Sequence, residues 1–134
     1  DDASDISELE KSQVEYNLPK GKEYRLLVDR MVTYCEIHLA EEEYYNVLLD
    51  LTQLMLFAGE ISYSLEIAQE LRSKLESKNN LKSILAETNL MISKIYWSQA
   101  YWDECKFYVS EAEQLFKSIS SNPGITLILI SLFL

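Results

Sequence analysis

Hydrophobic side chains recur every three or four residues along most of the chain, which places them on one face of an α-helix. Five segments carry this spacing: residues 23–39, 44–58, 61–75, 81–96 and 102–119. Only short polar or glycine-containing breaks separate them, such as Gly59 and the run from Lys78 to Asn80. Helices joined by such short turns pack antiparallel to their neighbours. The sequence therefore predicts an all-α fold of consecutive antiparallel helices.

The composition agrees with this fold and limits the kinds of partner. Three glycines and two prolines leave few residues with which to build the tight turns of a many-stranded sheet. Acidic residues outnumber basic ones by 22 to 12, so the formal net charge is −10. Surfaces that bind nucleic acid or anionic membranes need clustered Lys and Arg, which this sequence lacks. We expect neither kind of partner.

An internal repeat indicates how the helices are arranged. When the chain is shifted on itself so that Leu51 falls on Ile92, apolar positions fall on apolar positions through both segments. The same shift aligns Leu75 with Phe116 and the small Thr52 with Ser93. A repeat of this size is typical of helix pairs that stack into an array.

The second copy resembles the tetratricopeptide repeat. The resemblance lies in Ile92, Ser93 and Tyr96, in the run from Ala100 to Cys105 (AYWDEC), and in Val109 and Ala112. The period, about 41 residues, exceeds the usual one of about 34, the first copy lacks the aromatic residues, and neither copy has the closing proline. The resemblance implies a short right-handed solenoid of stacked antiparallel helix pairs, in which Tyr96 and Trp102 fill the gap between one pair and the next.

The resemblance also implies a binding surface, because the first helix of each pair lines a concave groove in this family. We therefore expect a groove for a partner protein formed by Asn46, Leu49, Gln53, Leu56, Phe57, Glu87, Leu90, Lys94 and Trp97. Of the positions that clamp a terminal carboxylate in chaperone-binding members, only Lys94 matches. An apolar or aromatic segment with basic flanks suits the acidic chain better, with Trp97 as the first candidate anchor.

Two functions are consistent with these features. The first is a non-enzymatic adaptor that holds a peptide or helix of another protein in the groove. The alternative is a structural part of a larger helical-solenoid subunit of a multiprotein complex, with no binding site of its own. In that case the same apolar side chains pack on further helices.

No residue pattern in the sequence indicates catalysis. The glycines Gly21, Gly59 and Gly124 lie too far apart to form a phosphate-binding loop. His38 follows Cys35 by three residues, but nothing in the sequence supplies a third group to orient such a pair. We expect no catalytic residues, no metal ligands and no cofactor. Cys35 and Cys105 are predicted to be buried hydrophobic residues in a reducing compartment, the cytoplasm or the nucleus.

The sequence divides into three parts. Residues 1–22 form an acidic lead-in segment that we expect to be partly disordered, and residues 23–120 form the helical repeat domain. Residues 121–134 form an apolar tail, whose run ITLILISLFL is shorter than the roughly 20 residues that span a bilayer. The tail stands where the next repeat would begin. We expect it to pack against the helices, with association with a partner or a second copy as the alternative.

Overall fold

The computed structural model describes residues 22–119, and this part of the chain contains helices and no strands. The predicted all-α class is confirmed for these residues. The predicted lead-in and tail lie almost wholly outside the described residues. The chain divides into two compact units, Asp1–Leu39 and Ala40–Leu134, which we describe separately.

The described helix of the first unit is α2, Lys22–His38. We expected Leu27, Val28 and Met31 to form part of a buried stripe. Val28 is buried, whereas Leu27 is 52% exposed and Met31 is 50% exposed. Helix α2 is the only helix in the described part of this unit, and no other described helix of the unit covers the rest of its apolar face.

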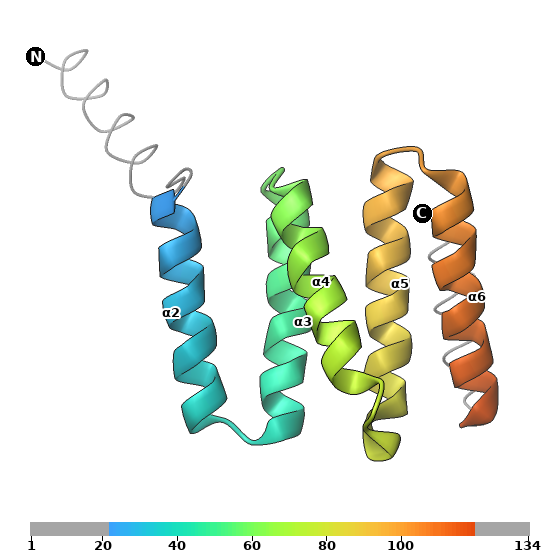
Figure 1. The fold of residues 1–134 in the computed structure, drawn as a ribbon, viewed down its shortest axis with the longest axis horizontal. Helices are drawn as coiled ribbons and strands as arrows, with labels where there is room; N and C mark the ends of the chain where they lie inside the picture. The colour runs from blue at the N-terminus through green and yellow to red at the C-terminus, as the bar shows by residue number, and fades with distance from the viewer. Residues whose placement is uncertain (1–21, 120–134) are drawn as a thin grey trace, which may run out of the picture. The chain divides into compact units, whose positions relative to one another are not determined.

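The second unit contains four α-helices and one short 3₁₀ helix within its described residues (Figure 1). In chain order these are α3 (Glu41–Phe57), α4 (Ile61–Leu75), η1 (Asn79–Leu81), α5 (Lys82–Ser98) and α6 (Trp102–Ser118). Consecutive α-helices run in opposite directions (Figure 1). Each of them packs on the next one, and α3 also contacts α5. Helices α3 and α5 are therefore neighbours although α4 separates them in sequence.

The helix boundaries repeat with the period that the sequence predicts. Helix α3 begins at Glu41, and α5 begins one such period later, at Lys82. Helix α4 begins at Ile61, and α6 begins the same distance further along the chain, at Trp102. The unit therefore contains two helix pairs, α3–α4 and α5–α6, built on one plan.

The turns inside the two pairs share the same hydrogen bonds. After α3, Glu60 N–H donates to the Met55 carbonyl at 2.9 Å; after α5, Tyr101 N–H donates to the Tyr96 carbonyl at 3.0 Å. In each turn, the residue before the N–H donor has a positive φ, which is 84° at Gly59 and 62° at Ala100. This is the Schellman arrangement that ends many helices, and it normally uses glycine at this position.

Small residues allow the helices of a pair to approach closely. Thr52 of α3 and Ser64 of α4 are both 0% exposed, and Ser64 Oγ donates to the Thr52 carbonyl at 2.8 Å. In the second pair the corresponding positions hold Ser93 and Cys105, which are also buried. Cys105 belongs to the α5–α6 core, which consists of Ala86, Leu90, Cys105, Val109, Ala112 and Phe116.

Two exposed residues on the first and last described helices of the unit, Leu54 of the predicted apolar segment 44–58 and Trp102, depart from the expected packing. Leu54 is 59% exposed, whereas its repeat equivalent Ile95 is fully buried in a cluster with Ala68 of α4. Helix α3 is the first of its unit, so no earlier helix of that unit covers Leu54. Trp102, which we expected to fill a gap between pairs, is 49% exposed, and no described helix follows α6.

Candidate protein-binding surface

The predicted groove residues lie on the two neighbouring helices α3 and α5. Partly or fully exposed side chains recur three or four residues apart along α3, and along α5 they stand seven and then three residues apart because Leu90 between them is buried. We call this surface the α3–α5 face. Its members are Asn46, Asp50, Gln53 and Phe57 on α3, and Glu87, Lys94 and Trp97 on α5.

Two carboxylates, Asp50 on α3 and Glu87 on α5, interact electrostatically across the α3–α5 face. Partial burial raises the pKa of Glu87, and the negative charge of Asp50 on α3 raises it further. Within residues 22–119, neither carboxylate forms an ion pair with Lys or Arg. The centre of the α3–α5 face is therefore acidic, with no Lys or Arg of the described residues paired to these carboxylates. Asp50 was absent from the predicted groove residues, although its spacing from Asn46 and Gln53 would have identified it.

Three of the predicted apolar groove residues contribute to the packing of the helices. Leu49 and Leu56 of α3 are partly buried and pack against a cluster that contains Met91 and Ile92 of α5. Leu90 was expected to be exposed but is only 6% exposed, because it belongs to the α5–α6 core. Leu90 follows the fully buried Ala86 by four residues and therefore lies on the same helix face, which is the core side of α5.

The exposed apolar side chains of the α3–α5 face stand at the C-terminal ends of both helices. Phe57, the last residue of α3, is 75% exposed, and Trp97 near the end of α5 is 43% exposed. Helices α3 and α5 run in the same direction, so these two residues lie toward one end of the face (Figure 1). The face thus combines an acidic centre with an aromatic end.

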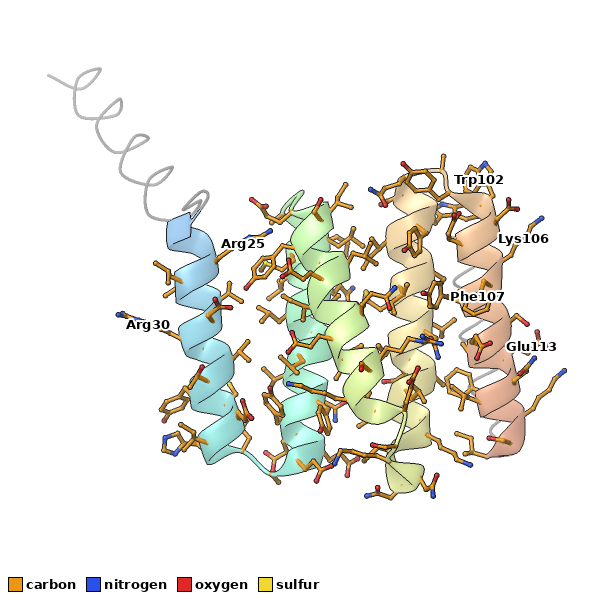
Figure 2. All side chains as sticks on the ribbon, in the orientation of Figure 1. Arg25, Arg30, Trp102, Lys106, Phe107 and Glu113 are labelled. Carbon is orange, nitrogen blue, oxygen red and sulfur yellow. The ribbon has the colours of Figure 1, made fainter. Side chains whose placement is uncertain are left out.

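A pocket of about 390 Å³ lies beside Trp97, at the turn between α5 and α6. Among the described residues it is lined by Trp97, Trp102, Cys105 and Lys106. The indole rings of Trp97 and Trp102 meet edge to face, with centroids 4.8 Å apart. Figure 2 shows Trp102 beside the turn and Lys106 further along α6. The sequence prediction named only Trp97 here, although the two tryptophans flank one short turn.

Cys105 lies in an environment that favours the protonated thiol. Its side chain is buried in the α5–α6 core, and burial raises its pKa above the ordinary value for cysteine. A raised pKa keeps the thiol protonated at neutral pH, and the protonated form is a poor nucleophile. The prediction that Cys105 is a small buried hydrophobic residue is confirmed. Cys35 in the first unit is only partly buried, which corrects the same prediction for that residue.

Polar side chains between α4, α5 and α6 bind one another. Arg72 Nε donates to Asn89 Oδ1 at 2.8 Å, and Gln69 Nε2 donates to Tyr108 Oη at 3.0 Å. The Arg72 guanidinium also lies over the Tyr108 ring, 5.2 Å from its centroid. These groups use their hydrogen bonds within the protein, so their role is to fix the packing of the two pairs.

The other features considered in the sequence contribute no site. The exposed His38 lies against the Tyr34 ring, with centroids 4.2 Å apart. In the part of the chain that the structure describes, no three His, Cys, Asp or Glu side chains gather as a metal site. None of the helices between residues 22 and 119 combines the length and hydrophobicity that crossing a membrane requires. Comparison of the chain with protein-family models, curated proteins and solved structures finds no match.

Proposed function

We propose that the chain is a non-enzymatic adaptor that binds a basic segment of a partner protein on the α3–α5 face. The observation that carries this proposal is the acidic pair Asp50 and Glu87, held on adjacent helices and without a cation among the described residues. A Lys or Arg side chain between the two carboxylates would offset their repulsion, and hydrogen bonds to charged groups are among the stronger ones.

Aromatic side chains supply the second element of recognition. Phe57 and Trp97 offer exposed apolar area at one end of the face, and aromatic residues of this kind contribute much of the energy at protein interfaces. The partner segment that suits the face carries a Lys or Arg and, some residues away, an apolar or aromatic side chain. The net charge of −10 also speeds the approach of a basic partner.

We further propose that the two pairs form a short solenoid like that of tetratricopeptide repeats. Three features support this: the repeated spacing of the helix boundaries, the direct contact between the first helices α3 and α5, and the small residues where the helices of each pair cross. In such arrays the first helices of successive pairs line one common surface. The α3–α5 face corresponds to that surface.

A binding experiment with defined peptides tests the adaptor function. Two sets of peptides are prepared, each with one aromatic residue; one set has Lys and Arg on its flanks, and the other has Glu. Each peptide is titrated with the full chain and its binding is measured by fluorescence anisotropy. Basic peptides are expected to bind. The double variant D50N/E87Q is expected to weaken that binding by about tenfold or more, which corresponds to a lost charged hydrogen bond.

The control is E70Q/E113Q, which removes the same charge from α4 and α6. Both residues form ion pairs along their own helices, Glu70 with Lys74 and Glu113 with Lys117. Equal losses of affinity in the two double variants would mean that only net charge matters, and the α3–α5 face would not be the site. Absence of peptide binding by the unmodified chain would contradict the adaptor function and favour the structural alternative.

The structural alternative has one observation in its favour. Trp102 and Phe107 of α6 are 49% and 52% exposed, so α6 presents apolar area that a further helix could cover. A chain with this role needs no ligand on the α3–α5 face. The peptide titration therefore separates the two functions.

A further inference from the structure

The pocket at the α5–α6 turn occupies the place where the repeat would put its next junction. Three of its lining residues, Trp97, Trp102 and Lys106, are the repeat equivalents of Leu56, Ile61 and Leu65 in the first pair. In the first pair those three positions are not open. They pack against a cluster formed by Ala68 of α4 with Met91, Ile92 and Ile95 of α5. The first pair therefore packs on the second through three positions. The equivalent positions of the second pair line the pocket.

The same repeat shift identifies the side chains that would fill the pocket. It relates Met91 to Leu132 and Ile92 to Phe133, both of which belong to the apolar run at residues 125–134. The shift also relates Glu87, which is only partly buried on α5, to Ile128. Chain residues at the right distance in sequence therefore have the chemistry that the pocket needs.

We infer that the pocket binds the chain's own segment 125–134, with Leu132 and Phe133 as the residues that enter it. Aromatic pairs favour edge-to-face or offset contacts, which the indoles of Trp97 and Trp102 offer to a phenyl ring. Lys106 replaces Leu65 of the first pair, and its aliphatic stem can cover an apolar neighbour while the ammonium stays in water. The inference concerns the α6 side and does not depend on peptide binding at the α3–α5 face.

Linkage within one chain favours this occupant over a second copy. Residues 125–134 follow α6 through a connection of a few residues, so their effective concentration near α6 is on the order of millimolar. A second copy reaches that concentration only in very concentrated solution. Occupation of the pocket is therefore expected to be independent of protein concentration.

Intrinsic fluorescence measures occupation directly, because Trp97 and Trp102 are the two tryptophans of the chain. The variants F133D and L132D are compared with the unmodified full chain by emission maximum and by acrylamide quenching. Both variants are expected to shift the emission to longer wavelength and to increase quenching, since water then reaches the indoles. The matched control I128D alters the same segment at the position equivalent to Glu87 and is expected to leave both signals unchanged.

Far-UV circular dichroism establishes that each variant keeps the helices of the unmodified chain. Should an aspartate variant lose them, F133A replaces it, because it removes the ring without introducing a charge. Unchanged fluorescence in the Phe133 and Leu132 variants would overturn the inference, as would an equal change in I128D. A fluorescence signal of the unmodified chain that varies with its concentration would also overturn it, because a second copy would then be the occupant.

Discussion

Ala100 occupies a backbone conformation that L-residues adopt at a cost. Its φ of 62° lies in the same region as the φ of 84° at Gly59, the equivalent position of the first turn. A Cβ atom in this left-handed region meets the following carbonyl oxygen, which glycine avoids. The turn hydrogen bonds of the second pair are nevertheless the same as those of the first. The second turn therefore keeps its hydrogen bonds despite the strain at Ala100.

Exchanging the residues at these positions should change stability in opposite directions. Ala100→Gly is expected to raise the free energy of unfolding by about 0.5–1 kcal/mol, and Gly59→Ala to lower it by a similar amount. A Cβ at Gly59 meets no atom within 4 Å, so only the backbone contributes there. Urea unfolding measures both values. The control Ala58→Gly, at a φ of −74°, should be destabilising, and stabilisation there would contradict the explanation.

Glu87 should make stability depend on pH. Its pKa in the folded protein is raised by burial and by Asp50, so between the unfolded and folded pKa values the folded state binds more protons. The free energy of unfolding therefore falls as the pH rises from the unfolded pKa through the folded pKa. Glu87→Gln should remove this part of the pH dependence and be more stable than the unmodified chain at neutral pH.

Urea unfolding at a series of pH values between acid and neutral measures this effect. The control Glu70→Gln replaces an exposed glutamate on α4 that is ion-paired with Lys74. Its pH profile should follow that of the unmodified chain. If the free energy of unfolding of Glu87→Gln falls with rising pH as steeply as that of the unmodified chain, another group causes the pH dependence.

At the scale of the elements, the α5–α6 pair depends on the residues that α6 places in its core. Phe116 is 3% exposed and belongs to the α5–α6 core, whereas Phe107 on the same helix is 52% exposed. Phe116→Ala is expected to lower the free energy of unfolding by about 3–5 kcal/mol. Phe107→Ala should change it by less than about 0.5 kcal/mol, as is usual for surface positions. Equal losses, measured by urea unfolding, would place Phe107 in a packed environment.

The sequence pattern predicted the helices well because periodicity and short breaks are local signals. The fourth stripe, from Leu81 to Tyr96, is buried or partly buried throughout its apolar positions. Leu54, Trp102 and Leu90 were misplaced for a different reason. Periodicity shows that a residue lies on an apolar face, but the neighbouring helix decides whether that face is covered. Periodicity therefore does not predict the exposure of residues at the ends of an array or on the flanks of a helix.

The candidate surface was predicted only in part for the same reason. Asn46, Gln53, Glu87 and Lys94, which we expected to line a groove, are at least partly exposed. The coupling of Glu87 with Asp50 requires the distance between two helices, which one sequence does not give. The expectations for partner, compartment and the tetratricopeptide family stay predictions.

For the whole molecule, self-repulsion of the acidic surface should limit stability. The net charge of −10 at pH 7 disfavours the compact state, and added salt screens that repulsion. Raising NaCl from low to moderate concentration should therefore raise Tm by a few degrees. The effect should vanish near the sequence pI of 4.5, and thermal scans at both pH values measure it. A fall in Tm with salt at pH 7 would show that ion pairs such as Lys78–Glu41 outweigh the repulsion.

The pattern of contacts between α3, α4, α5 and α6 has a mechanical consequence. These helices pack mainly on their sequence neighbours, apart from the contact between α3 and α5 and the contacts of Tyr108 of α6 with Gln69 and Arg72 of α4. Helices α5 and α6 share the most extensive of these interfaces, so a force that pulls α6 away from α3 is expected to separate the two pairs before it parts α5 from α6. Under load, the unit should therefore yield first at the junction between its pairs.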